Sequence, residues 1–442
     1  MNIQNIAFEE INGRLLEFLD SSPTSFHAVA GMKERLEAAG YRRLYEGQSW
    51  KLEAGSGYYV TRNDSALIAF RIPKADFKGF QIMASHSDSP TFKVKSNAEI
   101  EVDKQYLKLN VEKYGGMLCA PWLDRPLSVA GRVVVRSSAG VETRLVKVDR
   151  DLLIIPTLAI HMNRQVNEGY AFNAQKDMLP LLGDGTAKDG FLKLIAGEAG
   201  VDEADILDTD LFLYTRDKGT VLGLNGEFLA APRLDDLQCA FASLEGFLEA
   251  DPKESVAVHC VMDNEEVGSG TKQGAASTFL RDVLHRINTG LGRTEEQYLT
   301  ALASSFMVSA DNAHGVHPNQ PDKADPTNRP YLNQGIVIKY SANQKYTTDA
   351  ISGAIFKSVC EKAGVPYQTF TNRSDMLGGS TLGNISNAQV ALNTVDIGLP
   401  QLAMHSCYET AGSRDTGYLA EAARVFYSLT VSGDGDGNYQ LI

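Results

Sequence analysis

The sequence is poor in cysteine and has no cysteine pair with the spacing of a zinc motif. Its 442 residues include five scattered cysteines and no Cys-x-x-Cys pair (Cys119, Cys239, Cys260, Cys360 and Cys407). An odd number of isolated cysteines argues against a disulfide-stabilised scaffold and against a zinc site with cysteine ligands. We therefore expect free thiols and a cytoplasmic protein.

Long hydrophobic runs and an excess of basic residues are also missing. No stretch approaches the roughly 18 apolar residues of a membrane-spanning helix. The first 20 residues carry charges within an amphipathic pattern, which is unlike a signal peptide. The formal net charge of −13 argues against nucleic acid or an anionic membrane as the main partner. Acidic substrates stay possible, because a local basic pocket can lie within an acidic protein.

The residues that are present predict a globular α/β protein with more than one domain. Hydrophobic residues make up 43% and charged residues 22%, as in ordinary soluble proteins. Apolar periodicity predicts helices over about residues 6–19 and 25–39 and strands over 57–61, 65–72 and 79–84. Between residues 93 and 231, alternating polar and apolar residues predict half-exposed antiparallel strands. We predict an α/β domain formed by residues 1–92 and 232–442, with residues 93–231 as an inserted β-rich domain.

Three acidic residues follow one predicted buried strand. The run 255–262 is apolar and β-branched, and Asp263, Glu265 and Glu266 come directly after it. Neighbouring carboxylates repel each other and resist burial, and a divalent cation removes both penalties. A solvated acidic turn is the alternative for such a pair taken alone.

Four further candidate ligands occupy comparable places. His86 and Asp311 follow predicted strands, His405 follows an apolar run, and Asp235 opens a predicted helix. Taken singly, they could be loop histidines or helix caps. Because side chains beyond the carboxyl ends of strands in an open α/β sheet meet in one crevice, we expect these residues to converge with the acidic pair.

Such a set could hold two zinc-like ions. Two histidines, one bridging carboxylate and two terminal carboxylates leave open positions for water and substrate. Two ions can polarise a carbonyl and generate hydroxide, which is the chemistry of aminopeptidases. Glu265 then remains as general base, and Asp88 can orient His86 from behind. Zinc is the expected metal, with cobalt or manganese as alternatives.

The chain resembles the aspartyl aminopeptidases, a family of dizinc metallopeptidases, over nearly its whole length. The matching motifs are FLDSSPTSFHAV (residues 18–29), SHSDSP (85–90), RLDDL (233–237), DNEEVGS (263–269), DNAH (311–314) and MH (404–405). The resemblance implies a mixed-sheet catalytic domain and an inserted β-rich domain that serves dimerisation. It also implies that His86 and Asp311 hold one metal, that Glu266 and His405 hold the other, and that Asp235 bridges them.

The resemblance extends to substrate binding and assembly. It implies that His161 reaches the site of a neighbouring subunit and that His314 lies near the substrate. Lys339, beside Tyr346, would attract an acidic side chain, and Asp375 would hold the free α-amino group. Family members form dimers that assemble into tetrahedral dodecamers, so we expect a homo-oligomer acting on peptides.

Three alternatives stay open. An aminopeptidase that is broad or prefers neutral residues would use the same chemistry. A dizinc deacylase or carboxypeptidase would need an arginine for a substrate carboxylate, for which Arg164 and Arg373 are candidates. A non-catalytic scaffold is disfavoured, because Glu265 and all five ligand positions are intact.

Overall fold

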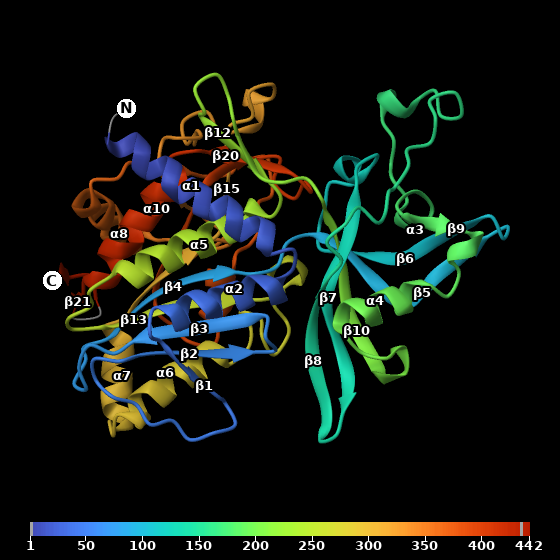
Figure 1. Ribbon diagram of the computed structural model, residues 1–442. Helices are drawn as coiled ribbons and strands as arrows, with labels where there is room; N and C mark the ends of the chain where they lie inside the picture. The colour runs from blue at the N-terminus through green and yellow to red at the C-terminus, as the bar shows by residue number, and fades with distance from the viewer. Residues whose placement is uncertain (1–2, 434–435) are drawn as a thin grey trace.

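In the computed structural model, which describes residues 3–433 and 436–442, the chain forms two lobes (Figure 1). The larger lobe contains a nine-stranded sheet. Across the sheet its strands are β1 (Arg42–Leu44), β2 (Gly57–Arg62), β3 (Ala66–Arg71), β13 (Val256–Met262), β4 (Phe80–His86), β14 (Phe306–Ala310), β18 (Asn393–Gly398), β16 (Ile336–Lys339) and β17 (Tyr367–Phe370). Strands β13, β4, β14 and β18 pair in parallel, whereas β3 and β16 flank them in antiparallel pairs. The predicted α/β fold with a mixed sheet is confirmed.

Helices cover both faces of this sheet because its central strands are apolar on both sides. One face packs on α1 (Ile3–Ser21), α2 (Ser25–Ala38), α5 (Leu234–Glu249), α8 (Ala350–Ala363) and α10 (Asp415–Ser428). The other packs on α6 (Phe279–Gly290), α7 (Glu295–Ala303) and α9 (Leu382–Ser386). The parallel strands are fully buried, and their carboxyl ends lie at one edge of the sheet.

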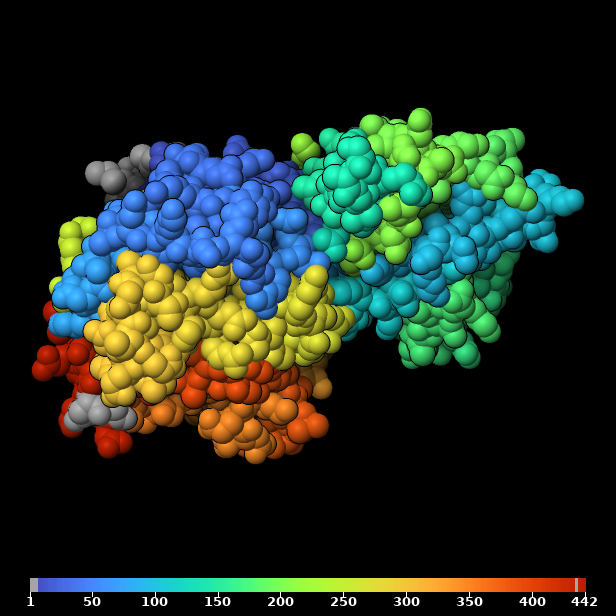
Figure 2. All heavy atoms as spheres, turned by 90° about the horizontal axis from the view of Figure 1, so that it is seen from below, coloured from blue at the N-terminus to red at the C-terminus, as the bar shows by residue number. Residues whose placement is uncertain are grey.

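The smaller lobe is built on a six-stranded antiparallel sheet. Its strands in spatial order are β8 (Gly140–Lys147), β7 (Leu127–Ser137), β10 (Ile206–Thr215), β5 (Thr91–Val102), β6 (Tyr106–Tyr114) and β9 (Leu181–Asp184). Helix α4 (Phe191–Ala199) packs on β8, and the short α3 (Ala174–Asp177) lies near β6. Figure 2 shows this lobe extending from one side of the larger lobe.

A third sheet joins chain segments that are distant in sequence. It contains β11 (Thr220–Leu222), β12 (Phe228–Ala231), β20 (Glu409–Gly412), β19 (Pro400–Leu402) and β15 (Ala313–His314). The end of the predicted insertion therefore pairs with C-terminal strands and not with the six-stranded sheet. A last hairpin is formed by β21 (Val431–Gly433) and β22 (Tyr439–Leu441).

Two expectations based on absences can be compared with the structure. All five cysteines are free thiols, as expected. Among the helices of the described residues, none has both the length and the apolar character needed to cross a bilayer.

Candidate metal centre

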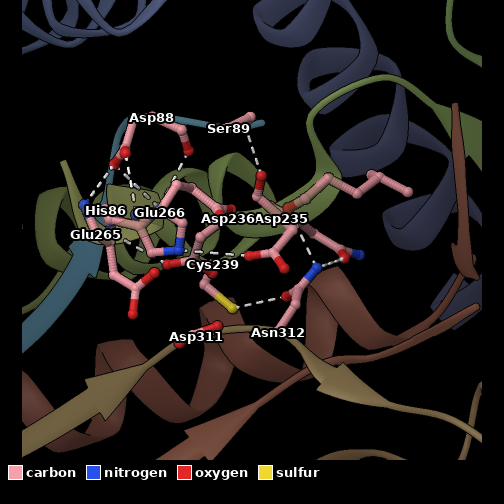
Figure 3. Close-up of polar contacts among 12 residues, drawn as sticks. His86, Asp88, Ser89, Asp235, Asp236, Cys239, Glu265, Glu266, Asp311 and Asn312 are labelled. Carbon is pink, nitrogen blue, oxygen red and sulfur yellow. Dashed lines mark hydrogen bonds and ion pairs between the residues drawn. The ribbon is translucent and has the colours of Figure 1, made fainter. Parts of the chain in front are cut away.

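Neighbouring parallel strands place the predicted ligands together. His86 is the last residue of β4 and pairs in register with Met262 of β13, so the acidic segment starts immediately beside it. Asp311 directly follows β14, the other neighbour of β4. Figure 3 shows His86, Asp311 and the two glutamates gathered with Asp235 from the start of α5.

Asp235 lies between the two histidines. Its Oδ1 is 3.4 Å from His86 Nε2, and its Oδ2 is 3.8 Å from His405 Nε2. The same Nε2 of His405 is 3.4 Å from Glu266 Oε2. A carboxylate that turns one oxygen to each of two imidazoles has the arrangement of a ligand shared by two ions.

Unpartnered polar atoms point to the same conclusion. His86 Nε2 and Asp235 Oδ1 are buried and make no hydrogen bond, although buried polar atoms are normally paired. The potential ligand atoms within 4.8 Å of one another form three overlapping groups: His86 with Asp235, Asp236 and Asp311; His86 with Glu265 and Glu266; and Asp235 with Glu266 and His405. This donor set of imidazoles and carboxylates fits zinc.

Crowding of carboxylates in a buried place shifts their proton affinities. Burial, reinforced by nearby carboxylates, raises the pKa of Glu265 to about 8 and raises the pKa of Glu266 well above its usual range. Burial likewise raises the pKa of Asp311. Burial also acts on Asp235, but its contact with His86 outweighs that effect and lowers its pKa. Bound cations would stabilise the ionised form of all these groups.

Asp88 holds the candidate base in place. Its carboxylate accepts hydrogen bonds from the backbone N–H of Glu265 at 3.1 Å and of Glu266 at 3.2 Å, and from the hydroxyl of Tyr114 at 2.7 Å. One of its oxygens is 3.4 Å from His86 Nδ1. The backbone carbonyl of Asp88 is 3.1 Å from the same nitrogen, so Asp88 contacts the His86 ring, and its orienting role stays a prediction.

Two further buried carboxylates support the centre, and the sequence analysis did not select them. Asp236 accepts a hydrogen bond from the backbone N–H of His86 at 3.1 Å. Glu409 accepts one from the backbone N–H of His405 at 2.8 Å and one from that of Asp235 at 3.0 Å. Asp236 could have been found from its place beside Asp235, whereas Glu409 has no local signal.

The smaller lobe also touches the centre. The loop after β6 passes beside Glu266, and a Cβ on Gly115 would lie 3.1 Å from Glu266 Cβ. Gly115 has a φ of +78°, a conformation that glycine adopts without strain. The backbone N–H of Leu118 donates to the carbonyl of His405 at 3.1 Å, so the two lobes meet at one of the predicted ligands.

A cavity of about 200 Å³ opens beside these ligands. Lys339, Tyr346 and His314 line it, as does Phe370, which the sequence analysis did not select. The Phe370 ring lies 6.3 Å from that of Tyr346 and 6.2 Å from that of His314. These three rings form an aromatic wall of the cavity.

Lys339 is buried within this wall and is not a free cation. Its Nζ donates to the carbonyls of Asp311 at 2.7 Å and Asn312 at 3.2 Å, and it lies 3.9 Å from Asp311 Oδ1. Burial acts most strongly and lowers its pKa, but Asp311, Tyr346 and Asp396 together outweigh burial and raise it. Lys339 therefore stays charged.

Two predicted substrate residues lie elsewhere. The exposed Asp375 is outside the cavity lining and pairs with Arg373 at 2.7 Å, and this pairing lowers its pKa to about 2. His161 is exposed on a loop of the smaller lobe and does not line the cavity of its own chain. The roles assigned to both remain predictions.

The comparisons with known proteins decide the family. Residues 18–427 match the family model described as aminopeptidase I zinc metalloprotease, M18. The chain belongs to the M18 family of zinc aminopeptidases. The predicted family, enzyme class and zinc dependence are therefore confirmed.

Relatives match over almost the whole chain. The probable M18 family aminopeptidase 2 of Clostridium acetobutylicum is 47% identical over 428 residues, covering 95% of this chain and 99% of the relative. The corresponding Pseudomonas aeruginosa protein is 46% identical, covering 95% and 98%. Among solved structures, a chain in the cryo-EM structure of the Ape4 and Nbr1 complex is 37% identical with a TM-score of 0.93, covering 96% of this chain and 86% of that one. A chain of the S. cerevisiae mApe1 dodecamer is 28% identical with a TM-score of 0.83, covering 97% of each.

Proposed function

We propose that this M18 aminopeptidase removes the N-terminal residue from peptides with two metal ions and Glu265 as general base. In this proposal His86 and Asp311 hold one ion, Glu266 and His405 hold the other, and Asp235 lies between them. The observation that carries it is Asp235, whose two oxygens face His86 and His405 at 3.4 and 3.8 Å. Bound zinc would polarise the scissile carbonyl and activate the attacking water.

Glu265 is suited to move the proton. Burial raises its pKa, and bound cations would bring the pKa back towards neutral pH, where a carboxylate can both take up and release a proton. Its backbone is fixed by Asp88, while its side chain faces the cavity. The carboxylate can accept the proton of the water and then donate it to the leaving amine.

We further propose a preference for N-terminal Asp or Glu, based on Lys339. An ammonium group has three N–H donors, and two of those on Lys339 bind main-chain carbonyls. The third can bind a substrate carboxylate in the cavity. The competing candidate is a preference for neutral residues, which is favoured by the proximity of Asp311, because that carboxylate already offsets part of the Lys339 charge.

A deacylase or carboxypeptidase has less support. Neither Arg164 nor Arg373 lines the cavity beside the metal centre. Arg373 is already paired with Asp375, and Lys339 is the cation that the cavity offers to a substrate.

One experiment tests reaction and specificity together. The enzyme is chelated, reloaded with zinc and assayed on the p-nitroanilides of Asp, Glu and Leu, beside Glu265→Gln and the surface control Glu53→Gln. We expect release from Asp and Glu, and a loss of about 10²- to 10⁴-fold in Glu265→Gln at unchanged zinc content. Faster release from Leu would overturn the acidic preference only. An active Glu265→Gln variant would overturn the role of the base.

We also propose that residues 93–231 serve homo-oligomerisation, up to the predicted tetrahedral dodecamer, in the cytoplasm. Strand β8 is an edge strand with exposed Val141 and Leu145, and unpaired strand edges favour pairing with another chain. The loop around His161 exposes Ile160 (52%) and Met162 (75%), as expected for a segment that contacts another subunit. The mApe1 relative is a dodecamer, which supports the same proposal.

A further inference from the structure

A second cavity lies behind the metal centre, at the junction of the two lobes. It measures about 410 Å³, twice the size of the cavity beside the ligands. Segments that line it include the start of α2, the end of β10, and the loops that follow β4 and β13. Its volume lies within the range typical of small-molecule sites.

Five aromatic side chains lie among the polar residues that line this junction cavity. Phe26, Trp122 and Tyr214 line it, as do Tyr114 and Phe212, whose rings meet edge to face at 5.7 Å. The guanidinium of Arg132 stacks 4.3 Å from the Phe26 ring centre. Planar apolar groups pack well against walls of this kind.

Arg233 gives the junction cavity a positive charge without an ion-pair partner, and burial lowers its pKa to about 10 although the charges of Asp20 and Glu409 act to raise it. Its guanidinium makes one hydrogen bond, to the carbonyl of Leu19 at 2.8 Å, and its Nε is buried without a partner. Within the described part of the chain, no carboxylate lies at ion-pair distance from it. Asp210, which also lines the cavity, is already shared by Lys93 at 2.9 Å and Arg132 at 3.0 Å.

We propose that the junction cavity binds a small aromatic anion, with its ring system between the aromatic walls and its carboxylate or sulfonate on Arg233. A guanidinium with a buried, unpartnered Nε is costly, and an anionic group that pairs with it lowers that cost. The size, the aromatic lining and the unpaired charge together select this ligand class.

A ligand bound in this cavity affects the catalytic residues through Tyr114. Tyr114 lines the cavity, and its hydroxyl donates its single proton to Asp88, which holds the backbone of Glu265. A ring system that packs against Tyr114 and shifts its hydroxyl away from Asp88 would loosen Asp88 and lower kcat, while the substrate cavity and KM stay unchanged. This effect on catalysis rests on the proposed function, whereas binding itself does not.

The probe for the test is 8-anilinonaphthalene-1-sulfonate, which is an aromatic anion that fluoresces when it enters an apolar site. It is titrated against the zinc-loaded enzyme, Arg233→Met, Ser25→Trp and the control Leu224→Ser. Arg233→Met removes the charge, Ser25→Trp fills the cavity from its lining, and Leu224→Ser removes an exposed leucine (96%) elsewhere. Should Arg233→Met fail to fold, Ser25→Trp still tests whether the probe binds in this cavity, because this variant keeps Arg233 and changes only the space available.

We expect saturable binding of one probe per chain, weakened about ten- to hundredfold in Arg233→Met, lost in Ser25→Trp and unchanged in Leu224→Ser. At saturation we expect kcat on Asp-p-nitroanilide to fall about fivefold or more at constant KM. Equal binding in Ser25→Trp and parent, or displacement by substrate analogues, would overturn the site. Full occupancy without a change in kcat would overturn its effect on catalysis.

Discussion

At the scale of single residues, His259 carries a pH-dependent contribution to stability. It lies within β13, fully buried, with Nδ1 3.0 Å from the hydroxyl of Ser243. Burial lowers its pKa from 6.5 to about 3. Between these values the unfolded chain binds more protons than the folded one, so acidification from pH 6.5 towards 3 lowers the free energy of unfolding.

Replacing His259 by glutamine should remove this contribution. At pH 7 we expect the variant to be about 1–3 kcal/mol less stable, because core packing and the Ser243 contact are disturbed. Below about pH 6 the difference from the parent should shrink by about 1.4 kcal/mol per pH unit. Urea unfolding of both proteins between pH 4 and 7 measures this difference in the free energy of unfolding. A difference that stays constant with pH would show that His259 is protonated equally in both states.

The residue scale also shows where sequence reasoning reaches its limit. His86, Asp311 and the acidic pair stand at the ends of apolar runs, and the parallel pairing of β4 with β13 and β14 brings them together. Glu409 and Phe370 lack such a signal, because their positions depend on sheet contacts between distant segments. The charge of Lys339 could be predicted, but its two carbonyl acceptors could not, since they arise from tertiary packing.

At the scale of elements, strand β18 holds two segments of the substrate cavity. The carboxylate of Asp396, buried on β18, accepts hydrogen bonds from the N–H and hydroxyl of Thr347 at 2.5 and 2.6 Å. It also accepts one from the hydroxyl of Thr381 at 2.6 Å. Thr347 follows Tyr346, and Thr381 itself lines the cavity. One buried side chain therefore positions both segments.

The substitution Asp396→Asn should loosen these two segments. An amide offers one acceptor oxygen in place of two, so at least one threonine loses its partner. We expect KM for Asp-p-nitroanilide to rise about tenfold, which corresponds to one charge-assisted hydrogen bond, with kcat and zinc content nearly unchanged. The matched control is Asp325→Asn, a loop aspartate that binds Thr327 and Asn328 outside the cavity lining. A fall in kcat alone would contradict this positioning role.

Periodicity identified most elements near the site but not every sheet partner. The helix expected at 25–39 is α2 (Ser25–Ala38), and the strand expected at 255–262 is β13 (Val256–Met262). Strand β11 pairs with β12, and β12 pairs with β20 from near the C-terminus and not with the strands before it. Short strands carry little information on their partners, because pairing depends on contacts far along the chain.

At the scale of the whole molecule, the predicted assembly makes each active site depend on two chains. The loop that carries His161 exposes apolar side chains and lies in the smaller lobe. If His161 serves a neighbouring subunit, His161→Ala damages the site of the neighbour, whereas Glu265→Gln damages its own. Two inactive variants can then complement each other.

Mixing the two variants tests this dependence. Each alone should be nearly inactive, and light scattering should show both as oligomers of the parent's size. After dissociation and reassembly in equal amounts, about one quarter of the sites should combine Glu265 with a neighbour's His161 and regain activity. Glu265→Gln mixed with His86→Ala should regain none through His161, because each change damages the active site of the chain that carries it. Hybrids without recovered activity, verified by two affinity tags, would show that His161 does not act between subunits.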